Sequence, residues 1–301
     1  MKLSTILSAA SLVGILLLSA SLFAQAPEKP QIMSSEIRSN VHLLTGDGGN
    51  IAVLNGERSL LVIDNGYAEQ AADLYDSIVA VGNKPIRFLV NTHWHFDHAG
   101  GNEFLGHRTN IVAHENVRKR LAEGQNMKAF NRVIEPVEPQ GLPVVTYTEG
   151  TTLYEAGQVV RLQHFAKGHT DGDSIAFIKP AKIVHMGDHY FAGMFPFIDL
   201  GSGGSVQGVA RNIEQVLTMI DDSWVVIPGH GPLSTKADLA KTLTMLQQSI
   251  AWMREQIAAG LSVEQISQSG LPKNLEPWNV GFIKAPNWIA TVHASLSAEN
   301  K

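Results

Sequence analysis

Short hydrophobic runs separated by glycine, asparagine and charged residues dominate the chain after residue 36. In the first half they lie at 41–44, 50–54, 59–64, 87–92 and 110–114. Their shortness, and the turn-forming residues between them, predict buried strands joined by tight turns. Further on, a strand within 142–165 leads into a hairpin that turns at Ala156-Gly157, and a second hairpin is predicted around Pro180-Ala181. A last buried strand is predicted at 224–230.

A different spacing alternates with these strands. Hydrophobic residues recur at helical intervals in four segments, where they would share one helix face. The segments are 69–81, 115–124, 205–220 and 235–259. Ser262 followed by Gln265 fits a capping box for a short further helix. The strands fall into two blocks, each followed by a helix, which predicts an α/β domain with packed sheets between helices.

Composition limits the function. The 301 residues are 44% hydrophobic with a formal charge of −5, so most of the chain should fold, and no basic cluster suits nucleic acid. The sequence contains no cysteine, which excludes disulfides, thiolate metal ligands and thiol nucleophiles.

The first residues resemble an export signal. Lys2 precedes an apolar run that ends in small residues, so residues 1–24 are interpreted as a signal peptide rather than a membrane anchor. Residues 25–36 are then predicted to be a linker, and 37–301 a single domain with a C-terminal helical extension at 235–301. We expect a periplasmic or secreted protein without stable membrane association after cleavage. Its oligomeric state stays open.

The stretch THWHFDHAGG directly follows the strand predicted at 87–92. Alternate residues of an extended loop face the same way, so His93 and His95 can reach one metal ion. Asp97 and His98 can reach a second point nearby. Imidazole nitrogens and carboxylate oxygens are the ligands that zinc prefers in cysteine-free sites. This loop therefore predicts a site for two adjacent metals.

One loop cannot complete either coordination sphere. Three further ligand-type residues lie at or just after the ends of predicted strands: His169, Asp188 and His230. A glycine precedes each of them, which lets the backbone approach closely.

The strings THWHFDHAGGN, GHTDGD, MGDHYF and IPGHG, in this order, resemble the metallo-β-lactamase-fold superfamily. The resemblance implies a four-layer αββα sandwich with the metals at one edge, between the sheets. It implies that His93, His95 and His169 bind the first metal, that Asp97, His98 and His230 bind the second, and that Asp188 bridges both. Asp188 stands where lactamases of the thiolate class carry cysteine, so the site is more similar to the broader hydrolases of the superfamily.

The implied activity is hydrolysis of an amide, ester or lactone bond in a small molecule. Two Zn²⁺ ions, with iron or manganese as alternatives, would lower the pKa of a shared water to about 7. Asp97 is the candidate catalytic residue, expected to orient the hydroxide and pass a proton to the leaving group. A β-lactam is the best named substrate, because export would place the enzyme where such compounds arrive.

Two other function classes remain. The first is an iron-dependent oxidoreductase of the sulfur dioxygenase type. The second is a binding protein on the same fold, although such relatives usually lose metal ligands and none is missing here.

Neighbouring residues carry weaker expectations. Asp64, Thr170 and Asp171 are candidates to support the ligands from behind. Capping or packing is expected of His114, buried structural roles of His164 and His185, and a pocket position is one hypothesis for His189. The aromatic and glycine-rich stretch 190–205 is expected near the mouth of the site, and the placement of Trp94 stays open. In the C-terminal extension, Trp278, Phe282 and Trp288 can either cap the site or mediate pairing.

Overall fold

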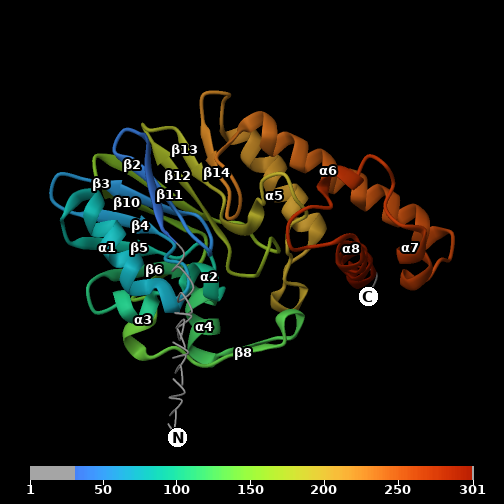
Figure 1. Cartoon of the computed structure of the whole chain (residues 1–301), viewed down its shortest axis with the longest axis horizontal. Helices are drawn as coiled ribbons and strands as arrows, with labels where there is room; N and C mark the ends of the chain where they lie inside the picture. Colours follow the sequence, from blue (N-terminus) through green and yellow to red (C-terminus); the bar gives the residue numbers. More distant parts are fainter. Residues whose placement is uncertain (1–30, 300–301) are drawn as a thin grey trace, which may run out of the picture. The chain divides into compact units, whose positions relative to one another are not determined.

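A computed structural model describes residues 31–299, and the chain from Gln31 onward forms one compact unit (Figure 1). The predicted signal peptide, 1–24, lies outside the described residues, as do residues 25–30 of the predicted linker. None of the helices in the described part of the chain combines the length and hydrophobicity needed to cross a membrane.

The first sheet has seven strands in the order β1-β2-β3-β4-β5-β6-β9. Strands β1 to β4 pair antiparallel in sequence, whereas β4, β5, β6 and β9 are parallel neighbours. Their bounds are Met33–Arg38, Val41–Thr45, Ile51–Asn55, Leu60–Ile63, Ile86–Val90, Asn110–His114 and Val145–Tyr147 for β1, β2, β3, β4, β5, β6 and β9.

The second sheet has six strands in the order β10-β11-β12-β13-β14-β15. The pairs are antiparallel except β13 with β14, which are parallel. The strands span Gly150–Glu155, Gln158–His164, Ser174–Lys179, Ile183–His185, Val225–Ile227 and Ser234–Thr235.

Alternation along the strands builds the layers. In β3, Ala52 and Leu54 pack between the two sheets, while Ile51 and Val53 face the helices outside the first sheet. Strand β12 in the second sheet likewise presents Ala176 and Ile178 inward. Because both faces are buried, these strands are nearly continuous hydrophobic runs rather than alternating ones.

Helices cover the outer faces of both sheets. Helix α1 packs on the first sheet through Leu74 and Ile78, and α5, α6 and α8 form the layer on the second sheet. The four-layer αββα prediction is confirmed (Figure 1). The helices are α1 Ala71–Gly82, α2 Phe96–Ala99, α3 Asn102–Leu105, α4 Glu115–Glu123, α5 Val206–Met219, α6 Lys236–Ala258, α7 Val263–Ser269 and α8 Ala285–Glu299. Single turns of 3-10 helix lie at 68–70, 128–130, 139–141, 187–189, 200–202 and 276–278.

Local signals placed several boundaries correctly. The Ser205 side chain caps α5 by accepting from the backbone N–H of Gly208, and Ser262 and Gln265 form the predicted capping box. Ala156 and Gly157 both have positive φ, as a two-residue hairpin turn requires.

Several short elements were not predicted, among them α2, α3 and β15, and two further differences have a clear physical reason. Strand β1 begins at Met33, inside the segment predicted to be a linker. Most of its side chains are exposed, and its pairing with β2 at the sheet edge supplies backbone hydrogen bonds, so no hydrophobic pattern marks it. A small hairpin of β7 (Gln125–Met127) and β8 (Arg132–Ile134) was also missed, because its strands have only three residues each.

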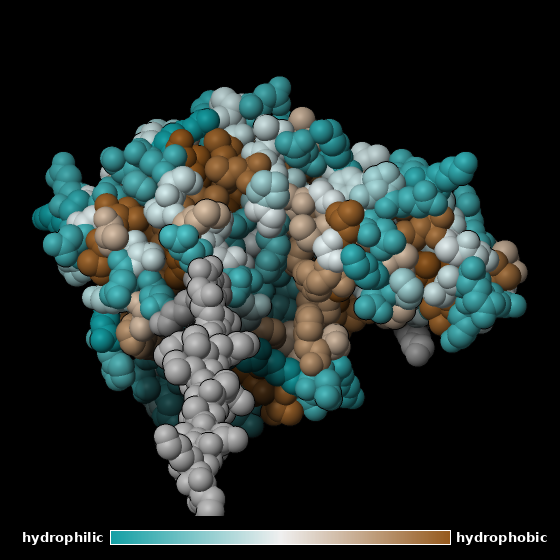
Figure 2. Space-filling model, in the orientation of Figure 1, coloured by the Kyte–Doolittle hydropathy of each residue, from teal (hydrophilic) through white to brown (hydrophobic). Residues whose placement is uncertain are grey.

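The C-terminal helices are integral to the second half of the core. The Trp288 side chain on α8 is fully buried and stacks on Phe195, with ring centroids 5.0 Å apart. Its Nε1 donates to Ser249 Oγ of α6 at 3.1 Å. The face drawn in Figure 2 is hydrophilic over much of its area, with separate hydrophobic patches between.

Candidate metal centre

The ligand loop starts where β5 ends at one edge of the first sheet. His93 and His95 lie in the loop after Val90, and Asp97 and His98 lie in the short helix α2. Asp64, at the end of the neighbouring parallel strand β4, reaches the same place. Its carboxylate accepts from both the backbone N–H and the hydroxyl of Thr92, each at 2.8 Å.

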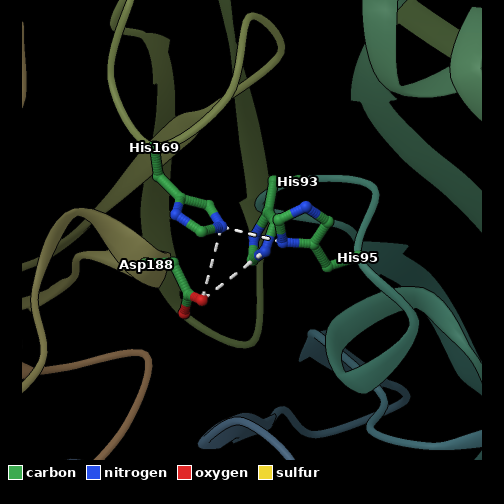
Figure 3. A group of neighbouring side chains, drawn as sticks. All are labelled: His93, His95, His169 and Asp188. Carbon is green, nitrogen blue, oxygen red and sulfur yellow. Dashed lines mark hydrogen bonds and ion pairs between the residues drawn. The ribbon is translucent and has the colours of Figure 1, made fainter. Parts of the chain in front are cut away.

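Four side chains from three segments converge on one point: His93, His95, His169 and Asp188 (Figure 3). His169 Nε2 lies 2.8 Å from His95 Nδ1 and 3.5 Å from Asp188 Oδ2. His93 Nε2 lies 3.8 Å from that same oxygen. All four residues are buried, so little of their surface is exposed to solvent.

A second group lies beside the first and is formed by Asp97, His98 and His230. His230 Nε2 is 3.1 Å from Asp97 Oδ2 and 3.3 Å from His98 Nε2. Asp188 joins the groups, because its Oδ1 is 3.0 Å from His98 Nε2 while its Oδ2 faces the first group. The seven residues predicted as ligands therefore meet in two adjoining sets, with Asp188 between them.

The atoms at the centre fit divalent metal ions. Among the described residues, His93 Nε2 and Asp188 Oδ1 are buried without a well-oriented hydrogen-bond partner. Such buried polar atoms are costly unless a ligand satisfies them. Imidazole and carboxylate donors without thiolate suit zinc, iron or manganese.

The outer nitrogen of each histidine in the first group has its own oxygen partner. His93 Nδ1 lies 3.0 Å from Thr92 Oγ1, His95 Nε2 lies 3.1 Å from Asp199 Oδ2, and His169 Nδ1 lies 2.8 Å from the carbonyl of Phe197. In the second group His98 Nδ1 lies 2.8 Å from Asp64 Oδ2. Such partners fix ring orientation and leave the inner nitrogen free to bind a metal.

Charges in this cluster shift its pKa values in opposite directions. Burial, together with the positive charge of His98, holds the pKa of His93 well below its usual 6.5. Burial also disfavours the charged form of His98 and of His230, but nearby carboxylates outweigh it. Among these carboxylates Asp188 has the largest effect. It helps to raise the pKa of His98 well above 6.5 and that of His230 to about 9. The histidines around Asp188 keep its pKa well below the usual range despite burial. The cluster thus stabilises positive charge at its centre.

A family model described as the metallo-beta-lactamase superfamily matches residues 44–234, a segment that includes all seven of these residues. This chain belongs to the metallo-beta-lactamase superfamily. The predicted resemblance is confirmed, and with it the prediction that the protein is a metallo-hydrolase.

The relatives of this superfamily member are named for different activities. A probable metallo-hydrolase, YqgX, of Bacillus subtilis (strain 168) is 26% identical over 61% of this chain and 85% of that protein. The acyl-coenzyme A thioesterase MBLAC2 of Gallus gallus is 25% identical over 62% of this chain and 73% of its own. The structure of a metallo-beta-lactamase from Pontibacter korlensis covers 72% of this chain and 99% of its own, with 23% identity and a TM-score of 0.60.

Of the three residues predicted to support the metal ligands in this superfamily member, only Asp64 does so. Asp64 holds the ligand loop as expected. Thr170 and Asp171 do not touch the ligands' outer nitrogens: Thr170 Oγ1 donates to Asp173, and Asp171 accepts from Arg120 at 2.7 and 2.8 Å. Adjacency to His169 was misleading, because the chain turns sharply after that residue and directs both side chains elsewhere.

The prediction missed Asp199. It lies 104 positions after His95 in the stretch 190–205, which the sequence placed near the mouth of the site without a specific role. Its Oδ2 accepts from Ser202 Oγ as well as facing His95, and hydrogen bonding to His95 helps to lower its pKa to about 2 against the effect of burial. The only sequence feature that could have indicated this role is an acidic residue within an aromatic and glycine-rich stretch.

Three further histidines have structural surroundings. His114 Nδ1 accepts from the backbone N–H of Asn116 and caps α4, while its Nε2 faces the carbonyl of Thr148 at 2.9 Å. His185 is buried and bonded to the carbonyl of Asn50, as expected. The pocket hypothesis for His189 is wrong, because its ring is buried behind the site next to Asn212, 3.0 Å away.

A cavity of about 300 Å³ opens onto the metal-ligand cluster. Trp94 lies outside this cavity, buried beneath the ligand loop with its ring centroid 4.5 Å from that of His95. Phe282 of the C-terminal extension does line the cavity, so this part of the extension caps the site. The lining residues are Asp47, Tyr67, His95, Phe96, Asp97, Met127, Phe130, Asp188, Phe191, Phe197, His230 and Phe282.

Proposed function

We propose that this protein is an exported zinc-dependent hydrolase that cleaves an amide, ester or lactone bond in a small molecule. The amide bond of a β-lactam ring is the best named candidate for the bond that is cleaved. Support for export is the sequence of residues 1–24, which resembles a signal peptide. Support for hydrolysis comes from superfamily membership and from relatives named as a metallo-hydrolase and a thioesterase.

One observation carries the proposal. The seven side chains lie in two adjoining groups, and the carboxylate of Asp188 reaches both. We propose that His93, His95 and His169 hold one ion, that Asp97, His98 and His230 hold the other, and that Asp188 bridges them. When bound, two such ions supply a hydroxide nucleophile near neutral pH and polarise the scissile carbonyl.

The protein's own groups position the reaction. Asp97 is half-buried and borders the cavity, and its Oδ2 lies 3.1 Å from His230 Nε2. From this place its carboxylate can orient the attacking water and carry a proton to the leaving group, which is the general acid–base role proposed for it. Asp199 and Asp64 hold the rings of His95 and His98 in place, so the ligand atoms need not reorganise as the reaction proceeds.

The cavity walls beside the metal-ligand cluster are largely apolar. Aromatic side chains make up half of the cavity lining, and Phe191 stacks on the His230 ring with centroids 4.9 Å apart. A low-dielectric wall strengthens the charge interactions that stabilise a developing oxyanion.

The test replaces His93 or Asp188 with alanine and compares both with His107→Ala, an exposed histidine away from the site. Each protein is stripped with chelator, reloaded with zinc and analysed for bound metal. Rates are then measured on a chromogenic β-lactam, a homoserine lactone, a thioester and a carboxylic ester. The proposal expects both site variants to lose bound zinc and at least about 10²-fold in rate. Full zinc loading and full rate in both variants would refute it.

A further inference from the structure

We propose that the cavity beside the metal centre is an acyl pocket that selects substrates with an uncharged apolar acyl group and disfavours those with a carboxylate on that acyl group. This inference rests on the proposed hydrolase function and specifies its substrate class. It follows from which side chains form the walls and which charges are absent from them.

One wall is an unbroken series of aromatic contacts that starts at the ligand loop. Tyr67 packs against Phe96, with ring centroids 5.7 Å apart, and Phe96 contacts Phe130 at 6.2 Å. Phe130 then contacts Phe197 at 4.8 Å, and Phe197 lies 5.8 Å from the ring of His95. Met127 adds an apolar surface to the same cavity. These side chains come from four separate segments, so the wall is built by the tertiary fold.

A second group of aromatic side chains lines the cavity and borders the second ligand group. Phe191 stacks on His230, and Phe282 contacts both rings, with centroids 6.0 Å from Phe191 and 6.5 Å from His230. Phe282 is 47% exposed and Phe130 is 41% exposed, so each retains a large free apolar surface. Such surfaces gain free energy when a ligand's apolar group covers them.

The charged residues around the cavity disfavour a negative charge on the acyl group of the substrate. Of the described residues that line it, none is lysine or arginine, and the exposed rim carries the carboxylate of Asp47. The nearest basic residues have other surroundings. The Arg132 guanidinium lies over the Phe96 ring at 4.0 Å, facing an adjoining cavity, and Lys128 borders a different one.

An acyl chain placed against these walls would position its carbonyl at the metal-ligand cluster. Each methylene that leaves water for such a wall contributes about a fourfold preference. A carboxylate at the far end of the same chain, away from His230 and the metal-ligand cluster, would lose hydration with no lysine or arginine of the lining to pair with, which is costly. The pocket therefore predicts a preference for amides, esters, lactones or thioesters whose acyl group is apolar and uncharged.

The experiment uses the zinc-loaded full chain and three 4-nitrophenyl esters. The hexanoate and the adipate monoester have acyl chains of equal length and differ only in a terminal methyl or carboxylate, and the acetate lacks the chain. We expect kcat/KM for hexanoate to exceed that for each of the other two by at least about tenfold.

Four variants locate the effect. Phe130→Ala and Phe282→Ala should each lower the hexanoate-to-acetate ratio by about threefold to tenfold. Phe104→Ala removes another partly exposed phenylalanine outside the cavity and should leave that ratio unchanged. Phe130→Lys should raise the adipate-to-hexanoate ratio, because it supplies the missing cation.

The outcomes separate the two proposals. Zinc-dependent hydrolysis of all three esters with equal kcat/KM, or ratios unaffected by Phe130→Ala and Phe282→Ala, would overturn the acyl pocket and leave the hydrolase standing. Zinc-loaded protein without activity on any ester, lactone, thioester or β-lactam would overturn both.

Discussion

Asp199 Oδ2 lies 3.1 Å from Nε2 of His95, while Nδ1 on the other side of that ring lies 2.8 Å from His169 Nε2. The carboxylate therefore fixes which nitrogen of His95 faces the metal-ligand cluster. We predict that Asp199→Ala lowers the affinity for the first zinc ion by about 10- to 100-fold. Competition with a chromogenic chelator measures this affinity.

The matched control for Asp199 is Asp171→Ala. Asp171 lies two residues after His169 in sequence, but its carboxylate pairs with Arg120 rather than with a metal ligand. Zinc affinity should stay within about twofold of wild type in this control. Equal losses of affinity in both variants would show that Asp199 acts only through general stability.

Asp64 is the buried support of the ligand loop. Its carboxylate accepts from Thr92 N–H, Thr92 Oγ1 and His98 Nδ1, each at 2.8 Å. In Asp64→Asn the amide group keeps the shape but places N–H groups against donors, so metal-free protein should lose about 1–3 kcal/mol of unfolding free energy. Urea denaturation in chelator measures this loss. Asp76→Asn, at an exposed position on α1, should change stability by less than about 0.5 kcal/mol.

Trp288 joins the C-terminal helix to the loop that carries Asp199. Its side chain is fully buried and stacks on Phe195. Trp288→Ala should lower the free energy of unfolding by about 3–5 kcal/mol, because it leaves a large cavity. Ser249→Ala, which removes the hydrogen bond from Trp288 Nε1 and the weak one to Met245 Sδ, should cost about 1 kcal/mol. A similar small loss in both variants, measured by denaturation, would argue against an integral C-terminal extension.

His114 makes stability depend on pH. Burial and the ring of His164, stacked on it at 3.9 Å, lower the pKa of His114 below 6.5. The folded protein thus disfavours the protonated ring, so the stabilisation from the neutral cap is present above pH 6.5 and declines as pH falls below it.

His114→Asn keeps a capping side chain for α4 without a titrating group. Between pH 7 and pH 5 the wild type should lose unfolding free energy faster than this variant, as measured by urea denaturation at each pH. Parallel curves would contradict the assignment, because any lost contact to Thr148 offsets the variant by the same amount at every pH.

Signals that act within a few residues were enough to predict much of the fold and the candidate ligands of the first loop, whereas His169, Asp188 and His230 were assigned through the family resemblance. Ser205 caps α5 through its own next turn, and His93 to His98 occupy one short loop, so local sequence contains the necessary information. Asp199 could not be assigned to His95, because their contact depends on how the chain folds between them. The same holds for Phe130, whose hairpin has strands too short to produce a periodic pattern.

The central claim is a two-metal centre that hydrolyses its substrate, and its most direct test is zinc titration of metal-free protein by native mass spectrometry, with hydrolysis followed in the same samples. The account predicts two zinc ions per chain, and a rate that rises with their binding. Asp188→Ala should bind at most one ion and lose the rate. Protein that binds no zinc, or that turns over only with iron while consuming oxygen, would contradict it.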